Sequence, residues 1–379
     1  MSAPPRVIVC VGGGGVGKTS TSAALAIALA RRGARALIVT IDPARRLAGA
    51  MGVALSDTAT PIALEGARGT LTALMPDPRR SAATFVEILF ADEPEARARI
   101  LDNRLYQGLA DAAAGVHEIV AMSLIAHASE SGLYDVIVID TAPSRNAMDF
   151  VTYPSRLTAL LGGKVMTFFA NFAANATANA TASVPRRRGF LARIGDRFGG
   201  QVESLVAGVV GPNLLRDTAS LFGELAIVRP RFVALTARAS ALLLGPAATY
   251  LLVSAPTAAA RDDAVYLHER IKRIGQRPSA ILMNLAAAQG EGDDWLDALE
   301  PAPDSDAPLD AVILALKAEL TARRAATAAA RVDLARRLPR LPIVSLPVVE
   351  SPAPEEVVAV LSEVLDGQLA ALGLDSLIA

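Results

Sequence analysis

Val11-Gly12-Gly13-Gly14-Gly15-Val16-Gly17-Lys18-Thr19-Ser20 is the stretch of the sequence that decides the fold. It follows a short apolar run at residues 7–11 and opens an alanine-rich segment at residues 21–32, which has the composition of a helix. A strand, a glycine-rich loop, a Gly-Lys-Thr triplet and a helix in this order predict a phosphate-binding loop. The alternative, a glycine-rich turn with a chance lysine, is disfavoured because the order, the spacing and the flanking segments all agree with the motif.

The chemistry of such a loop follows from its residue types. Glycines let backbone N–H groups converge on phosphate oxygens without Cβ clashes, and the N-terminus of the following helix adds a positive partial charge. We expect Lys18 to reach the β- and γ-phosphates of ATP, and the hydroxyl of Thr19 to bind Mg²⁺. The residues expected to contact the nucleotide are Gly12, Gly13, Gly14, Gly15, Val16, Gly17, Lys18, Thr19 and Ser20.

Composition narrows the class of protein. The 379 residues are enough for one large domain or for a core with a subdomain, and the net charge of −1 gives no reason to expect nucleic-acid binding. The single cysteine, Cys10, lies in the first apolar run, which excludes an intrachain disulfide and a cluster of thiolate ligands. Residues 1–5 do not form a signal peptide, so we expect a cytoplasmic protein.

Strand-like and helix-like segments alternate along most of the chain. Apolar runs typical of strands lie at residues 7–11, 36–41, 69–75, 135–140, 249–253, 279–283 and 341–346, and helical patterns lie at residues 78–131, 258–274, 309–337 and 355–372. The alternation predicts an α/β fold with a doubly wound, mostly parallel sheet, and with ligand-binding loops at the carboxyl edge of the strands. Residues 154–246 break it, so we expect an apolar helical subdomain there, inserted between the two parts of a P-loop NTPase core at residues 1–153 and 247–379.

Two uncharged stretches are about as long as a membrane-spanning helix. Residues 165–185 are too rich in Asn and Thr for such a helix, and residues 239–260 contain Gly245, Pro246 and Pro256. The end of a helix followed by a buried strand explains the second stretch better. We therefore expect no transmembrane helix.

Two aspartates follow predicted strands. Asp140 ends the run at residues 135–140, where a Walker-B-type carboxylate organises Mg²⁺, usually through water. A helix-capping turn is the alternative for Asp140, and the phosphate-binding loop upstream favours the metal role. For Asp42, which ends the second strand, a role in a nucleotide switch and a role as a helix cap are equally compatible with the sequence.

Residues 13–20, Asp42-Pro43-Ala44 and Asp140-Thr141-Ala142-Pro143-Ser144 together resemble the ArsA/Get family of P-loop ATPases. That family includes the arsenite-pump ATPase and the ATPase that targets tail-anchored membrane proteins, and it belongs to the wider MinD/ParA class. The resemblance implies that Lys18, Asp42 and Asp140 form the catalytic site, that Asn284 reads the purine base and that Pro347 lies in the adenine loop. It also implies a dimer with both nucleotides at its interface, and an apolar surface on the inserted helices for a hydrophobic client or a membrane partner.

The chain departs from the family pattern at two catalytic positions. The family has a signature lysine five residues before the Walker lysine, where this chain has Gly13, and a switch aspartate where this chain has Gly49. The cysteines that bind arsenite or zinc in the family are absent, since only Cys10 exists. The binding residues therefore remain, whereas we expect hydrolysis by the isolated chain to be weak.

Three functions fit these observations. The first is a nucleotide-driven switch of the ArsA/Get type, which handles a hydrophobic client or a membrane partner. The second is a non-hydrolysing subunit of a heterodimer with a catalytically complete paralogue, which Gly13 and Gly49 favour over a self-sufficient enzyme. The third is a MinD/ParA-type positioning ATPase, and the long apolar insertion disfavours it. The sequence leaves open whether the chain forms a homodimer or a heterodimer.

A basic segment lies inside the insertion. Arg186-Arg187-Arg188 precedes apolar residues spaced like one face of a helix at residues 190–198, with further arginines around the other face. One interpretation is a basic amphipathic helix that binds an anionic membrane, which would place the protein at the inner face of the membrane. The other is a helix packed on its own subdomain with a solvated basic face, and a surface helix commonly has this pattern.

Overall fold

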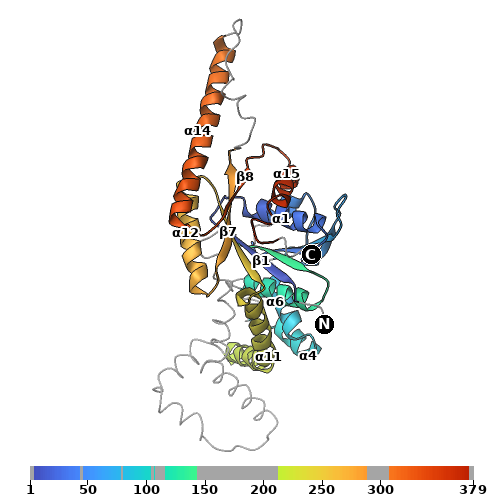
Figure 1. The fold of residues 1–379 in the computed structure, drawn as a ribbon. Coiled ribbons are helices and arrows are strands. Elements are labelled where there is room, and N and C mark those ends of the chain that lie inside the picture. The colour runs from blue at the N-terminus through green and yellow to red at the C-terminus, as the bar shows by residue number, and fades with distance from the viewer. Residues whose placement is uncertain are drawn as a thin grey trace, which may run out of the picture. The chain divides into compact units, whose positions relative to one another are not determined.

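The computed structural model describes residues 4–42, 46–77, 80–103, 106, 116–142, 212–287 and 307–374. The chain divides into two compact units. The first consists of Met1–Asp77, Leu124–Val151 and Ala239–Ala379, and the second of Pro78–Ser123 and Thr152–Arg238. The first unit contains the sheet (Figure 1). The expected division at residues 1–153, 154–246 and 247–379 stays a prediction.

The first unit is built on an eight-stranded sheet with the strand order β3-β4-β2-β5-β1-β6-β7-β8. Its strands are β1 Arg6–Gly12, β2 Arg35–Thr40, β3 Thr60–Ile62, β4 Thr70–Leu74, β5 Val136–Asp140, β6 Ala248–Ser254, β7 Pro278–Ala286 and β8 Ile343–Pro347. Every neighbouring pair is parallel except β3 with β4. The register places Cys10 of β1 beside Asp140 of β5 on one side and beside Leu251 of β6 on the other. The predicted α/β fold with a mostly parallel sheet is confirmed.

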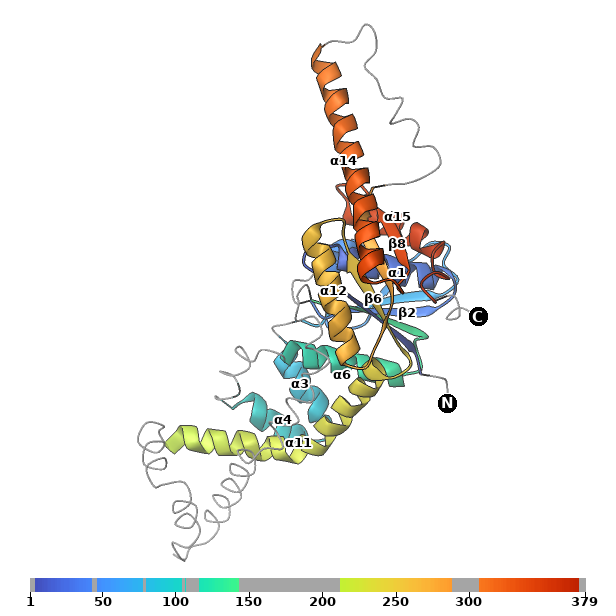
Figure 2. The same ribbon diagram turned by 60° about the vertical axis from the view of Figure 1, so that its left-hand side comes forward.

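Helices cover both faces of this sheet, as Figures 1 and 2 show. One face carries α1 (Lys18–Arg31) and α15 (Pro354–Asp366), with α2 (Arg46–Met51) packed against both, and the other carries α12 (Ala258–Arg273) and α14 (Ala307–Arg337). Side chains alternate along a strand, so Ile8 and Cys10 join the core cluster beneath α1, while Val7 and Val9 are buried on the opposite face. Burial on both faces explains why the strands are continuous apolar runs.

The second unit is helical in its described part. It contains α3 (Ser81–Leu89), α4 (Pro94–Leu101) and most of α11 (Pro212–Leu244), and it shares α6 (Val116–Glu130) with the first unit. Its core gathers apolar residues of α3, α4 and α11, with Phe85 and Phe232 in an edge-to-face contact at a centroid distance of 5.9 Å. Arg99 of α4 forms an ion pair with Glu224 of α11 at 2.5 Å.

Some expectations differ from the structure at the ends of elements. The helix expected at residues 355–372 ends at Asp366, and turns follow it. Residues 239–260 divide between the end of α11, β6 and the start of α12, in line with the predicted helix end and buried strand. Among the residues described here, no helix combines the length and the apolar character that crossing a membrane requires.

Residues 165–185 and the basic segment at residues 186–198 lie outside the described residues.

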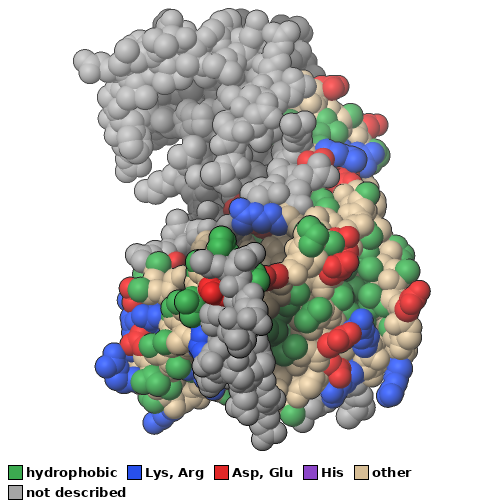
Figure 3. All heavy atoms as spheres, turned by 90° about the horizontal axis from the view of Figure 1, so that it is seen from above, with side chains coloured by type: hydrophobic (Ala, Val, Ile, Leu, Met, Phe, Trp, Pro, Cys, Tyr) green, Lys and Arg blue, Asp and Glu red, His purple; other side chains and the backbone are tan. Residues whose placement is uncertain are grey.

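On the face of the molecule drawn in Figure 3, acidic and basic side chains are interspersed with apolar ones. This mixture agrees with the net charge of −1.

Candidate nucleotide-binding site

The glycine-rich loop connects the end of β1 to the start of α1, as the motif predicts. Gly15 and Gly17 have φ angles of 73° and 78°, a left-handed conformation that glycine adopts without strain. A Cβ at Gly12 would overlap the carbonyl oxygen of Val253, and a Cβ at Gly17 would overlap the side-chain amide of Asn284. The loop therefore requires glycine at these positions for backbone conformation and for close packing. Gly14 and Gly15 are exposed, so the outer part of the loop is open to a ligand.

Lys18 lies in the first turn of α1 and is only 5% exposed. Its Nζ donates a hydrogen bond of 2.7 Å to the carbonyl oxygen of Gly13, inside the loop. Burial lowers the pKa of Lys18, while the carboxylates of Asp140 and Asp42 act in the opposite direction. A buried ammonium with one carbonyl acceptor gains further charge-assisted hydrogen bonds when phosphate oxygens reach it.

Asp140 ends β5 and is fully buried beside the first turn of α1. Its Oδ2 accepts hydrogen bonds from the hydroxyl of Thr19 at 2.8 Å and from that of Thr40 at 3.1 Å. Burial raises the pKa of Asp140 to about 6, although both hydrogen bonds and the charge of Lys18 lower it. The structure thus brings together the two residues that the sequence predicts around the metal.

The residues around Asp140 fit a magnesium ion. Its Oδ1 is buried and has no hydrogen-bond partner among the described residues, which is costly for a carboxylate. Carboxylate, hydroxyl and phosphate oxygens, together with water, are the ligands that Mg²⁺ takes. Thr19 and Asp140 would hold the ion, with Asp140 acting through water. No group of three or more His, Cys, Asp or Glu side chains suited to a metal occurs within the described ranges.

Asp42 follows β2 and is 5% exposed. Its backbone N–H donates to the hydroxyl of Thr40 at 3.1 Å, and its carboxylate lies 3.6 Å from Arg46 in the first turn of α2. The structure therefore brings Asp42 to the same edge of the sheet as Asp140, and its charge acts on Lys18. Gly49, where the family pattern has its switch aspartate, has open space beside its Cα.

Asn284 comes from the other half of the sheet, near the end of β7, and is 3% exposed. Its side-chain amide donates a hydrogen bond of 3.0 Å to the carbonyl oxygen of Val16, while its Oδ1 has no partner among the described residues. Leu285, the next residue, has a φ of 56°, an uncommon conformation for leucine. A strained backbone beside a buried amide with an unused acceptor is typical of a binding site.

Pro347 ends β8, where the register places it opposite Ala286. The next N–H, that of Val348, donates to the carbonyl oxygen of Ala286 at 3.0 Å. Pro347 therefore lies beside Ala286 at the end of β7, and Ala286 comes two residues after Asn284 in that strand. Ser20, like Thr19, is half-buried in the first turn of α1.

No motif in the sequence points to Asp263, which the structure places against the loop. Its carboxylate occupies the space that a Cβ at Gly13 would take. One signal was available, because Asp263 lies in the second turn of the helix that follows β6, and β6 pairs with β1. A side chain from that turn can reach a loop at the carboxyl edge of the neighbouring strand.

Comparison with known proteins identifies relatives of the part of the chain that contains most of this site. Residues 5–184 match the family described as anion-transporting ATPase. ATPase GET3 of Malassezia globosa is 34% identical over 165 residues, which cover 44% of this chain and 46% of that protein. ATPase get3 of Aspergillus terreus is 34% identical over 133 residues, which cover 35% of this chain and 38% of that protein. The chain thus spans less than half of the length of these relatives, and Asn284, Pro347 and Asp263 lie outside the family match.

Proposed function

The chain belongs to the ArsA/Get-type ATPase family, and on this premise we propose that it is an ATP-binding, Mg²⁺-dependent molecular switch. The observation that carries the proposal is the arrangement of Lys18, Thr19 and Asp140 around the loop. A buried ammonium at the loop and a buried carboxylate oxygen with no partner among the described residues, next to a hydroxyl, have the charges and the donors that a magnesium nucleotide requires.

Each part of the site has a role in this proposal. Backbone N–H groups of the glycine-rich loop and of the first turn of α1 bind the phosphates, assisted by the positive end of the helix. Lys18 exchanges its bond with Gly13 for bonds to the β- and γ-phosphates. Thr19 and Asp140 would hold Mg²⁺, which would neutralise part of the phosphate charge. Asn284 uses Oδ1, which has no partner within the described part of the chain, to read the amino group of adenine, and the segment at Pro347 covers the base.

Hydrolysis by the isolated chain is weak in this proposal. The support is that two positions of the catalytic pattern, residues 13 and 49, are glycines without a side chain to orient a water or to stabilise the transferred phosphoryl group. Asp42 remains at the site, paired with Arg46, and can follow the nucleotide state. Pairing with a catalytically complete paralogue is the second candidate, because such a partner would supply groups that a homodimer of this chain lacks.

We also propose that the nucleotide state is coupled to dimerisation and to a hydrophobic client or a membrane partner, with the protein in the cytoplasm or at the inner face of the membrane. The test is the mass of the purified chain by light scattering without nucleotide, with MgADP and with MgATP. A mass that changes between these states supports a nucleotide-driven switch. If the mass is the same in all three states although nucleotide binding is measured, the protein binds nucleotide but does not change its assembly with it, and the switch proposal is wrong.

A further inference from the structure

Gly13 lies against a carboxylate. An ideal Cβ at Gly13 would overlap Oδ2 of Asp263, and it would lie 3.2 Å from Cγ and 3.3 Å from Cβ of the same side chain. The carboxylate of Asp263 thus occupies the volume where the side chain of any other residue at position 13 would begin. A Cβ at position 13 requires Oδ2 to move away, and Cγ and Cβ of Asp263 remain in tight contact with it.

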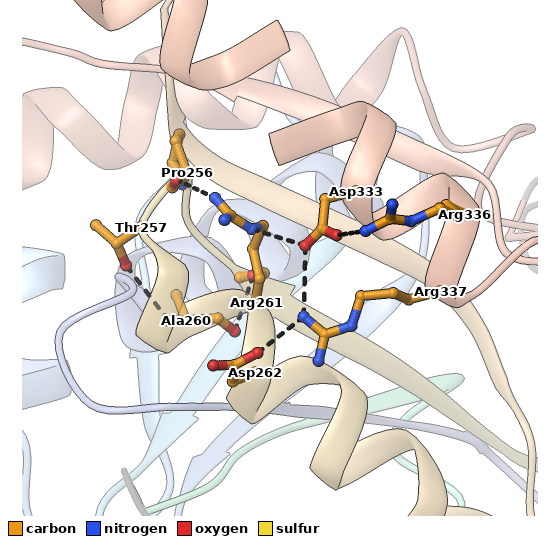
Figure 4. A network of polar contacts seen from close by, with 9 residues as sticks. Pro256, Thr257, Ala260, Arg261, Asp262, Asp333, Arg336 and Arg337 are labelled. Carbon is orange, nitrogen blue, oxygen red and sulfur yellow. Dashed lines mark hydrogen bonds and ion pairs between the residues drawn. The ribbon is translucent and has the colours of Figure 1, made fainter. Parts of the chain in front are cut away.

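The neighbours of Asp263 on α12 point elsewhere and hold the helix in place. Arg261 donates to Asp333 of α14 at 3.0 Å, and Asp262 accepts from Arg337 of α14 at 2.8 Å (Figure 4). The hydroxyl of Thr257 caps the helix by accepting from the N–H of Ala260 at 3.3 Å. Asp263 therefore projects toward the loop from a helix whose two preceding residues pair with α14.

The position of Lys18 indicates which part of a bound nucleotide would lie near Asp263. The ammonium of Lys18 donates to the carbonyl oxygen of Gly13, the residue that Asp263 contacts, and the charge of Asp263 acts on Lys18. The Walker lysine binds the β- and γ-phosphates. Gly13 and Asp263 therefore lie at the end of the loop where Lys18 would bind the β- and γ-phosphates, and Asp263 is the third carboxylate there, with Asp42 and Asp140.

We propose that Asp263 determines nucleotide specificity at this site, because its negative charge disfavours the γ-phosphate and so lowers the affinity for ATP relative to ADP. The proposal rests on the proposed function, since it concerns the same nucleotide site. ATP carries one more negative charge than ADP, and that charge is added at the end of the loop that faces Asp263. At an effective dielectric constant of about 40, between the protein surface and bulk water, two like charges about 6 Å apart change an affinity by about tenfold.

The direct test measures the dissociation constants of MgATP and MgADP by calorimetry for the wild type, Asp263→Asn and Asp262→Asn. We expect Asp263→Asn to tighten MgATP binding by about tenfold and MgADP binding by clearly less, and the difference to shrink at high salt. Asp262→Asn is the matched control, because it removes a carboxylate from the adjacent position of α12 that faces α14, and it leaves the ATP-to-ADP ratio unchanged. An unchanged ratio in Asp263→Asn, or weaker ATP binding, overturns the proposal.

A second experiment needs no nucleotide. Gly13→Ala is measured by thermal unfolding in the wild-type background and in the Asp263→Ala background. The overlap with Asp263 predicts that Gly13→Ala is destabilising in the first background and clearly less so in the second, whereas equal losses in both overturn the contact and the proposal with it. If the two positions are coupled but neither wild type nor Asp263→Asn binds nucleotide, the proposed function fails together with this proposal. Nucleotide binding with an unchanged ATP-to-ADP ratio overturns this proposal alone.

Discussion

Replacing Asp140 by asparagine should remove a pH dependence of stability from the nucleotide-free protein. The carboxylate is fully buried, and burial raises its pKa from the ordinary 3.8 to about 6. In the Asp140→Asn variant, the side-chain oxygen can still accept the hydrogen bonds that Thr19 and Thr40 donate to Oδ2. The shape of the site is kept, while the titrating charge is lost.

The sign of the effect follows from the raised pKa. Between pH 3.8 and about 6 the native protein holds a proton on Asp140 that the unfolded chain has released. The stability that this proton contributes is complete below the unfolded pKa and is lost as the pH rises through the folded pKa. With these two values, the contribution of Asp140 to the free energy of unfolding falls by about 1.4 kcal/mol from about pH 5 to about pH 7.5.

The assay is urea unfolding of the wild type and Asp140→Asn in that pH interval, without nucleotide or metal. The other titrating groups are common to both proteins, so the difference between the two free energies isolates Asp140. We expect the wild type to lose about 1 to 2 kcal/mol relative to the variant as the pH rises. Parallel curves would refute the assignment of Asp140 as a buried carboxylate with a raised pKa.

Three further predictions concern the nucleotide, turnover and the membrane. Asn284→Ala loses the bond to Val16 and the free acceptor, so ATP affinity should fall by about tenfold and the preference for ATP over GTP should shrink, and an unchanged preference in competition binding would remove Asn284 from the base site. The pure chain should release phosphate far more slowly than a complete family member because residues 13 and 49 are glycines, and brisk turnover would contradict this unless a carboxylate such as Asp57 substitutes. The membrane interpretation of the basic segment predicts flotation with anionic vesicles at low salt only, lost when Arg186, Arg187 and Arg188 become glutamate, and no association at low salt would leave the packed-helix interpretation.

The parts of the fold that the sequence predicts are those with strong local signals. β1 and β5 are continuous apolar runs, β1 leading into the glycine-rich loop and β5 ending in Asp140. The hydrogen bond between Thr19 and Asp140 joins the two motifs that the sequence already places around one magnesium ion. β3 escapes prediction because its three residues are partly exposed and pair antiparallel at the edge of the sheet. The helix at α15 ends before the apolar pattern does, since Leu369 and Leu372 are buried in turns.

The parts of the site that could not be predicted depend on side chains meeting across the fold. Asn284 donates to Val16 across 268 positions of the sequence, and neither residue has a local signal for that bond. In the sequence, Gly13 is a residue of the glycine-rich loop at the position where the ArsA/Get family has a lysine, whereas the structure shows that Asp263 fills the adjoining space. A strand order and a loop motif fix which edge these residues reach, but not which side chain contacts which backbone group.

The central claim is that the glycine-rich loop binds ATP with Mg²⁺ through Lys18, and the most direct measurement is calorimetric titration of MgATP into the wild type and Lys18→Ala. We expect saturable binding with one nucleotide per chain in the wild type and binding too weak to detect in Lys18→Ala, while circular dichroism shows that both proteins are folded. The ammonium makes charge-assisted hydrogen bonds to phosphate that alanine cannot replace. Equal ATP affinity in the two proteins would contradict the assignment of the site.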